Sequence, residues 1–221
     1  TLTTSNADDD IDLGSLASTG SVALSTNGTG GNASIVNATV LDLAASTVGG
    51  NLVATATTGN LTDSGTVTVG GTSTLTTSNT DDDIDLGTLS STGAVTLTTA
   101  GTTGNATIVN GIALDLAAST VNGNLIATAT TGNLTDSGTV TVTGTTSLTT
   151  TAANAAIDLG TLASTGTVTL STNGASGDAS IVNATALDLA ASTVGGDLVA
   201  TATIGNLTDS GTVTVGGTST L

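Results

Sequence analysis

The stretch GNLTDSGTVTV, at residues 59–69, occurs three times in the chain without a single change. Its other copies stand at positions 132–142 and 205–215, so the spacing from the first copy to the second equals that from the second to the third. Repetition at a fixed period predicts an array of stacked structural units, each too small to bury its own apolar face. The period of this one phrase therefore decides the fold class of the whole chain.

The same spacing divides the sequence into three repeats, residues 1–73, 74–146 and 147–219. The last two residues, Thr220 and Leu221, match Thr1 and Leu2 and begin a fourth repeat. We therefore expect residues 1–221 to form one continuous array, and we expect the chain to be a segment of a longer repetitive protein.

Shorter similarities inside a repeat indicate the turns of a solenoid. The stretch IDLGTLSSTGAVTLTT from Ile84 aligns without gaps with LDLAASTVNGNLIATA from Leu114, and VTVTGTTSLTT from Val140 is a shorter relative. Each has alternating apolar residues, a turn of Gly or small residues, and a second alternating strand. This predicts three turns of roughly 21 to 30 residues per repeat, about nine in all, in an all-β parallel β-helix, or β-solenoid.

The alternation predicts which side chains point inward. Ile11 and Leu13 point into the core around an outward Asp12, and Gly and Asn form the corners where a positive φ is needed. Other residues expected in the core are Val22, Leu24, Leu41, Leu43, Leu52, Ala54, Ala56, Val67 and Val69. If the aligned strands stack on each other, Asp12 lies beside Asp42, and two such charges repel by about 0.9 kcal/mol in water.

The phrase GNLTDSGTVTVGGTSTLTT resembles the short β-helical repeats of filamentous-haemagglutinin-like adhesins and related autotransporter or two-partner-secretion exoproteins. Those repeats carry Gly-x-Leu-x-Leu strands with Asn-Gly corners, as does GNLVATATTGNLTDSGTVTVGG from Gly50. The resemblance covers the whole chain and implies a right-handed β-helix outside a bacterial cell. The chain lacks the basic and aromatic residues of those adhesins, which favours a structural fibre over a receptor-binding surface.

The composition excludes several functions. The chain has no Lys, Arg or His and 17 acidic residues, all Asp, so it has nothing to neutralise nucleic-acid phosphates or anionic lipids. No apolar run approaches the ~20 residues of a membrane-spanning helix. Glu, Cys and Tyr are also absent, so the usual general bases and nucleophiles are missing. Aspartate pairs alone can serve polysaccharide-cleaving enzymes, but those need an irregular cleft, and we expect no enzyme and no required cofactor.

Two clusters of Asp are the candidate metal-binding residues. They are Asp8, Asp9, Asp10 and Asp12 in the first repeat and Asp81, Asp82, Asp83 and Asp85 in the second. Three carboxylates in one turn suit an oxygen-seeking cation such as Ca²⁺. The third repeat reads AANAAID and keeps only Asp158, so the alternative is a solvated acidic corner.

Two further patterns leave alternatives open. Thr-x-Thr pairs such as Thr55 and Thr57 resemble the faces of ice-binding proteins, although they recur only once per repeat. Asn-x-Ser/Thr triplets such as the one at Asn37 can accept glycans, or the Asn can serve as a corner or ladder residue.

The sequence favours a structural role as an extracellular fibre or stalk of a bacterial cell surface or matrix. Its expected partners are further copies of itself, end to end, as continuous repeats or in lateral bundles, together with other surface or matrix components. The first alternative is an adhesin shaft that presents a distal receptor- or glycan-binding domain. A β-helix that acts on polysaccharides or binds ice is a more distant alternative.

Overall fold

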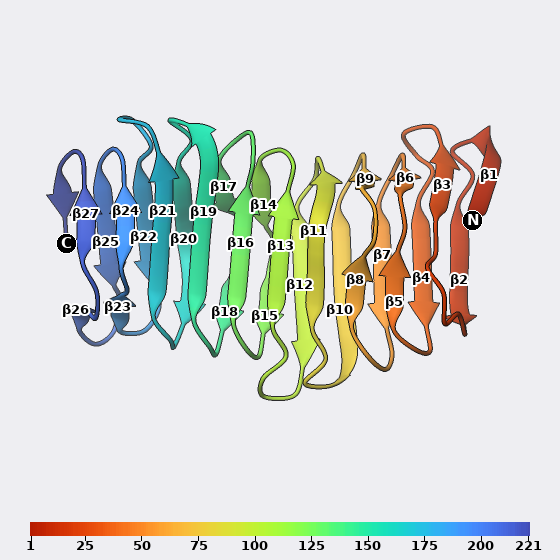
Figure 1. Cartoon of the computed structure of the whole chain (residues 1–221), viewed down its shortest axis with the longest axis horizontal. Helices are drawn as coiled ribbons and strands as arrows, with labels where there is room; N and C mark the ends of the chain where they lie inside the picture. Colours follow the sequence, from red (N-terminus) through yellow and green to blue (C-terminus); the bar gives the residue numbers. More distant parts are fainter.

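The structure is a computed structural model that describes all 221 residues, and its regular elements are 28 β-strands. Figure 1 shows a long stack of strands that lie across the long axis, with the N-terminus at one end and the C-terminus at the other. The chain winds through about 10 turns of about 21 residues, which confirms the all-β parallel solenoid predicted from the repeats. No helix in the chain is long and apolar enough to span a bilayer.

The strands form two sheets in which every pairing is parallel. The 15-stranded sheet contains β1 (Leu2–Ala7), β3 (Leu24–Asn27), β5 (Leu41–Leu43), β6 (Ser46–Val48), β8 (Leu61–Asp63), β9 (Val67–Val69), β11 (Ile84–Ser91), β13 (Ala106–Asn110), β16 (Leu125–Ala129), β19 (Thr146–Ala153), β21 (Val168–Asn173), β23 (Leu187–Leu189), β24 (Ser192–Val194), β26 (Leu207–Asp209) and β27 (Val213–Val215).

The 13-stranded sheet contains β2 (Ile11–Leu16), β4 (Ala33–Asn37), β7 (Leu52–Ala56), β10 (Ser73–Thr80), β12 (Val95–Ala100), β14 (Leu114–Leu116), β15 (Ser119–Val121), β17 (Leu134–Asp136), β18 (Val140–Val142), β20 (Ile157–Ser164), β22 (Ala179–Asn183), β25 (Leu198–Ala202) and β28 (Ser219–Thr220).

The strand register shows that one repeat spans three and a half turns. Ser73 pairs with Leu52 in the preceding turn and with Val95 in the following turn, which fixes the length of a turn at this point. Strand β2 lies in the 13-stranded sheet, its equivalent β11 in the 15-stranded sheet, and the next equivalent β20 in the 13-stranded sheet again. Because of this half turn, equivalent strands of neighbouring repeats lie in opposite sheets. The sequence alone predicted about three turns per repeat, without the half turn.

The aligned sub-repeats are not stacked neighbours. Ile84 pairs with Ala106, and Leu114 pairs with Leu134 on the other sheet, so the step from Ile84 to Leu114 corresponds to one and a half turns. The expected contact between Asp12 and Asp42 is therefore wrong.

Each of these two acidic residues has a hydroxyl residue as its neighbour in the next turn. Asp12 pairs with Ser34 and Asp42 pairs with Thr62. The two carboxylates lie on opposite sheets, so the charge repulsion expected from the sequence alignment does not arise between them.

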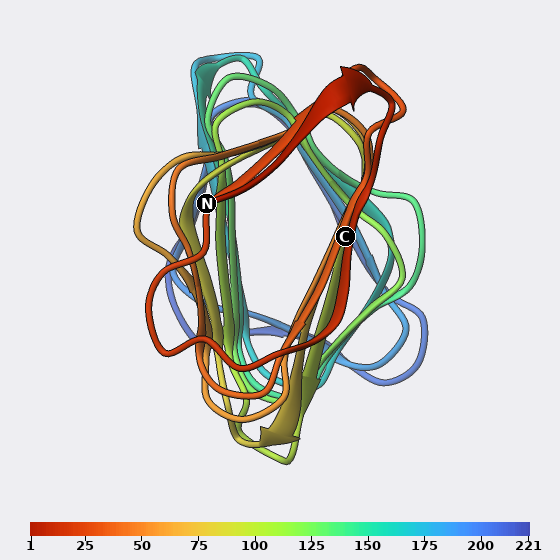
Figure 2. The ribbon, with the colours of Figure 1, turned by 90° about the vertical axis from the view of Figure 1, so that its right-hand side faces the viewer.

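The core is a continuous column of small aliphatic side chains. It comprises 44 buried residues in one cluster, and all the residues predicted to point inward belong to it, with Leu13 half-buried at the N-terminal end. One column stacks Ile35 on Ala54, Leu75 and Leu97 in successive turns. The view along the axis in Figure 2 shows the turns superposed around this narrow interior. Ala, Val, Leu and Ile side chains fill this interior, and the chain contains no aromatic residue.

Glycine and short polar residues form the corners, as predicted. Gly28 and Gly101 have φ values of 83° and 86°, which a side chain would strain. Asp8, Asp81 and Asn154 take the same left-handed region, with φ values of 63°, 62° and 62°, a conformation that Asn and Asp tolerate better than other residues. These three residues occupy the same position in the three repeats, so every repeat opens its first corner in the same way.

Candidate functional site

The first Asp cluster caps the backbone of the following turn. The Oδ1 atom of Asp8 accepts the backbone N–H of Gly30 at 2.7 Å, and Oδ1 of Asp10 accepts that of Asn32 at 2.7 Å. Asp9 accepts the side-chain amide of Asn6 at 2.9 Å. The fourth member, Asp12, is exposed on the outer face of β2.

The second cluster lies at the corner between β10 and β11, and its carboxylates also accept backbone N–H groups. The Oδ1 atom of Asp81 accepts the N–H groups of Thr102 and Thr103 at 2.8 and 2.9 Å. Asp82 accepts the N–H of Gly59 in the preceding turn, and Asp83 accepts that of Asn105 at 2.7 Å in the following turn. Asp85, like Asp12, is exposed on the outer face of its strand.

No group of three or more carboxylates lies close enough together to form a metal site. Five of the six adjacent Asp residues accept backbone N–H groups and so hold the corners, and the sixth, Asp9, accepts a side-chain amide. Calcium binding remains a prediction. It would show as a melting temperature that falls when EDTA is added, and an unchanged melting temperature would exclude a structural calcium ion.

A ladder of carboxylate and amide oxygens runs along one corner of the solenoid. Oδ1 of Asp10 accepts the N–H of Asn32, Oδ1 of Asn32 accepts that of Asn51 at 2.8 Å, and Oδ1 of Asn51 accepts that of Thr72 at 2.9 Å. Equivalent ladders are Asn60–Asp83–Asn105–Asn124–Thr145 and Asp178–Asp197–Thr218. Asp and Asn are interchangeable as acceptors here, and the ladder role predicted for Asn is confirmed at these positions.

A second, buried asparagine closes another corner in every repeat. Asn110 is fully buried. Its Oδ1 accepts the N–H of Ser91 at 2.8 Å, and its Nδ2 donates to the carbonyls of Ser91 at 3.0 Å and Ala113 at 2.6 Å. Its equivalents Asn37 and Asn183 make the same bonds to the equivalent corners. The sequence signal is an Asn at an inward position of the alternating strand, where an apolar residue is expected.

The repeated segment GNLTDSGTVTV contains an Asp that makes a third kind of hydrogen-bonded contact between turns, which the sequence analysis missed. Oδ1 of Asp136 accepts the N–H of Gly160 at 2.9 Å, and Oδ2 accepts both the N–H and the hydroxyl of Thr161 at 2.8 Å. Asp63 holds Gly87 and Thr88 in the same way. We call this arrangement the aspartate clamp. It fixes the register irregularity in the middle of β11 and β20.

Replacing Asp136 by Ala is expected to lower the free energy of unfolding by about 1 to 2 kcal/mol, because three charge-assisted hydrogen bonds to one bulge are lost. Urea denaturation followed by far-UV circular dichroism measures this. Asp158→Ala removes the same charge from the exposed face of β20, and no hydrogen bond involves that carboxylate. Equal losses in the two variants would show that the clamp contributes nothing beyond charge.

Two corner carboxylates have a lowered pKa. The pKa of Asp81 lies below its ordinary value because the backbone N–H groups of Thr102 and Thr103 donate to the ionised form. The pKa of Asp197 is lowered mainly by the backbone N–H of Thr218. Since the folded pKa is below the unfolded one, the stabilisation is present above the ordinary Asp pKa of about 3.9 and is lost as pH falls through the folded value.

The third repeat supplies a neutral variant for a test of this pH dependence. Asn154 stands at the position of Asp81, and its Oδ1 accepts the N–H of Ser176 at 3.0 Å. Asp81→Asn is therefore expected to keep the fold and to lose less stability than the parent chain between about pH 5 and pH 2. Unfolding midpoints measured across this range test it, and parallel curves for the two proteins would contradict it.

Hydroxyl side chains form a row on each sheet face. Five Thr residues pair in register on consecutive turns of the 13-stranded sheet: Thr55, Thr76, Thr98, Thr120 and Thr141. The matching row on the 15-stranded sheet is Thr128, Thr149, Ser171, Thr193 and Thr214. The sequence analysis placed such residues in a column only once per repeat. That was wrong, because the half turn brings different parts of the repeat into one column.

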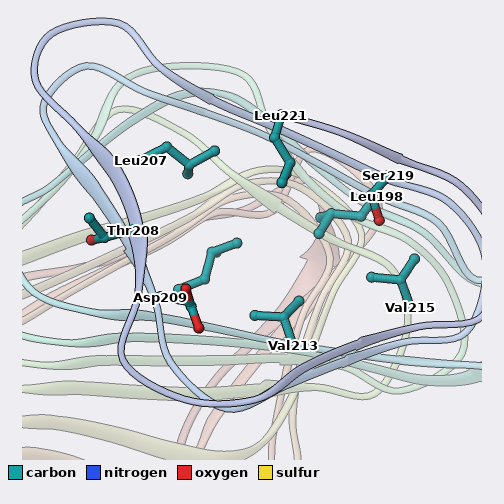
Figure 3. A pocket seen from close by; sticks show the side chains of 9 residues that line it. Leu198, Leu207, Thr208, Asp209, Val213, Val215, Ser219 and Leu221 are labelled. Atoms are coloured by element: carbon teal, nitrogen blue, oxygen red, sulfur yellow. The ribbon is translucent and has the colours of Figure 1, made fainter.

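A hollow lined mainly by apolar side chains lies at the C-terminal end of the solenoid. It has a volume of about 270 Å³ and is lined by Leu189, Leu198, Leu207, Thr208, Asp209, Val213, Val215, Ser219 and Leu221. Figure 3 shows Leu207, Val213 and Leu221 directed into one space at the last turn. The apolar side chains among them belong to the core or pack against it, so the hollow is the open end of the core at the last described turn.

Comparison with known proteins places the chain among repeat proteins. A family model described as "Repeats of unknown function (DUF5649)" matches residues 30–98, 103–171 and 176–221. The starts of the three matches, at positions 30, 103 and 176, are evenly spaced and in step with the repeat. No curated protein matches the chain, and no solved structure matches it. Because the three matched segments cover most of the sequence, the chain belongs to the family described as repeats of unknown function (DUF5649).

Proposed function

We propose that the chain is a structural β-solenoid rod, a fibre or stalk outside a bacterial cell, and that it has no catalytic role. The observation that carries this proposal is the continuity of the strands across the repeat boundaries. Strand β10 begins at Ser73, the last residue of the first repeat, and strand β19 begins at Thr146, the last residue of the second. Successive repeats therefore share strands and core without a linker, which suits a stiff spacer.

The surface supports the same role. It carries Thr, Ser and Asp and no Lys or Arg, so the net charge of −17 gives copies of the rod a mutual repulsion that is weakened by salt. The extracellular location rests on the resemblance to secreted β-helical adhesins. In the alternative role as an adhesin shaft, this rod holds a separate binding domain away from the surface, and receptor contact belongs to that domain.

Chains with different numbers of repeats test the rod. Each added repeat contributes three and a half turns, so the rod is expected to lengthen by about 17 Å at the ~4.8 Å spacing of strands. Small-angle scattering and negative-stain images of two-, three- and six-repeat chains measure the increment. A cross-section that widens while the length stays constant would contradict a structural rod. Labelling of intact cells that express the full-length protein tests its place outside the cell.

Ice binding is a second candidate, favoured by the rows of hydroxyl residues on consecutive turns. A rigid, regular array of methyl and hydroxyl groups can order water into a lattice. The expected result is thermal hysteresis in the parent chain that is lost in a Thr76→Lys, Thr98→Lys double variant. The control is Thr58→Lys, because Thr58 lies on a turn outside the row. The absence of hysteresis in the parent chain would remove this candidate.

A further inference from the structure

We propose that Asn173 and its equivalent Asn27 are sites of spontaneous deamidation, by which a corner of the solenoid gains a carboxylate after the chain has folded. Each of these Asn residues is followed by a Gly, and the chain contains two further Asn-Gly pairs, at Asn110 and Asn122. The structure separates the four pairs by the hydrogen bonds that hold the Asn side chain and the N–H of the following Gly.

The reaction needs only water and the two neighbouring residues. In an Asn-Gly pair the backbone nitrogen of Gly attacks the side-chain carbonyl carbon, Cγ, of Asn. A bond forms between that nitrogen and Cγ, the bond from Cγ to Nδ2 breaks, and Nδ2 leaves as ammonia with the proton that the backbone nitrogen gives up. Water then opens the resulting succinimide ring at either carbonyl and leaves an Asp or an isoaspartate. Glycine favours the first step, because it has no Cβ to hinder the approach.

Asn173 has both reacting groups within reach. It is exposed and is the last residue of β21, where the chain leaves the strand ladder. Its Nδ2 donates to the carbonyl of Thr151 at 2.9 Å, its Oδ1 accepts no hydrogen bond, and the N–H of Gly174 donates none. Its backbone carbonyl accepts the N–H of the exposed Asn154 at 2.6 Å. Only these two exposed hydrogen bonds have to open for the backbone nitrogen to approach Cγ.

Asn27 occupies the same corner of the first repeat. Its Nδ2 donates to the carbonyl of Ser5 at 3.2 Å, its Oδ1 accepts no hydrogen bond, and the N–H of Gly28 donates none. In the second repeat this position is Ala100, and Gly101 after it has a φ of 86°, close to the 83° of Gly28. The corner therefore forms without an Asn, and the amide is not required for the fold.

Asn110 has the same neighbour but is held in place. It is fully buried, its Oδ1 accepts the N–H of Ser91, and its Nδ2 donates to two carbonyls. The N–H of Gly111 donates to the carbonyl of Leu89 at 2.7 Å, so the attacking nitrogen is engaged as well. The reaction has to wait until this corner opens, which makes it slow in the folded chain. Asn122 is an intermediate case, because it is half-buried and its Nδ2 donates to a carbonyl one turn earlier at 2.6 Å.

Deamidation changes the corner in two ways. The new carboxylate of residue 173 has no hydrogen to donate to Thr151, and it adds a negative charge to a chain without Lys or Arg. An isoaspartate also lengthens the backbone by one carbon next to the carbonyl that accepts the N–H of Asn154. Aged chains therefore lose hydrogen bonds at this corner in the first and third repeats, while the second repeat, with Ala100, keeps it unchanged.

Peptide mapping of the aged chain tests the proposal. The folded chain and a urea-unfolded sample are kept in the same mildly alkaline buffer and digested with elastase, because the chain has no Lys or Arg for trypsin. Mass spectrometry then measures the conversion of each Asn. In the unfolded sample all four pairs are expected to react at similar rates. In the folded chain Asn173 and Asn27 are expected to react at least about ten-fold faster than Asn110, with Asn122 between them, because the buried corner must open first.

Asn173→Ala is the matched variant, because Ala stands at this position in the second repeat. It should show no modification at residue 173, keep the modification at Asn27 and have the far-UV circular dichroism spectrum of the fresh parent chain. Equal rates at Asn110 and Asn173 in the folded chain would overturn the proposal. So would an unmodified Asn173 in a folded chain that has been aged until the unfolded sample has reacted completely.

Discussion

Replacing Asn110 by Ala is expected to lower the free energy of unfolding by about 3 kcal/mol. The side chain is fully buried and satisfies the N–H and carbonyl of Ser91 and the carbonyl of Ala113. Its removal leaves the buried N–H and carbonyl of Ser91 without partners, and each unsatisfied buried group costs about 1 to 3 kcal/mol, whereas the carbonyl of the exposed Ala113 can bind water instead. Urea unfolding monitored by far-UV circular dichroism measures the loss.

Asn51→Ala is the matched control for this prediction. Asn51 is exposed, and the Thr72 N–H and hydroxyl that it holds can bind water instead. We expect this variant to cost less than about 1 kcal/mol. Asn183→Ala, in the third repeat, should resemble Asn110→Ala because its hydrogen bonds are equivalent. Similar small losses for Asn51→Ala and Asn110→Ala would show that the buried amide does not hold the corner.

Truncation of Leu97 to Ala is expected to cost about 2 to 5 kcal/mol. Leu97 is fully buried on β12 and stacks directly on Leu75 of the preceding turn. The smaller side chain leaves a cavity in a column that rigid strands on both sheets keep from collapsing, so both burial and packing are lost. The melting temperature and the urea midpoint should both fall.

The matched control is Ile126→Ala. Ile126 is 46% exposed on the outer face of β16, where truncation opens no cavity. Its effect should stay within about 1 kcal/mol. A loss at Ile126 as large as that at Leu97 would mean that the outer faces of the sheets are covered in solution, and would point to lateral association of rods.

Much of the fold could be predicted from local patterns in the sequence. Strand alternation identified the inward face correctly at Ile11, Leu41 and Val67, because the two-residue period of a strand is a local property. Corner positions such as Gly28 followed from the need for a positive φ. These features need no knowledge of which strand lies beside which.

The stacking register could not be predicted in the same way. The strands that begin at Ile84 and Leu114 have similar sequences because they occupy equivalent positions on the two opposite sheets. Similarity alone therefore does not show which strands are stacked neighbours. The chain uses this equivalence by returning to a similar strand after one and a half turns, on the other sheet. The pairing of Asp12 with Ser34 and the row of Thr residues follow only from the register.

The roles of the Asp residues also depend on the neighbouring turn. The sequence showed Asp8, Asp10 and Asp81 as members of two clusters of charge, for which either a cation or solvation was open. Their carboxylates accept N–H groups from residues one turn later in the chain, which the sequence alone did not indicate. The clamp of Asp136 has a similarly long separation and no local sequence signal.

One measurement tests the central claim that successive turns stack in parallel with a half-turn shift between repeats. The chain has no cysteine, so Asp12→Cys can be combined either with Ser34→Cys or with Asp42→Cys. The register places residues 12 and 34 side by side on the 13-stranded sheet and residue 42 on the other sheet. Intact mass and gel mobility after mild oxidation should show an intramolecular disulfide in the first double variant and none in the second. A disulfide between residues 12 and 42, with none between residues 12 and 34, would contradict the half-turn solenoid.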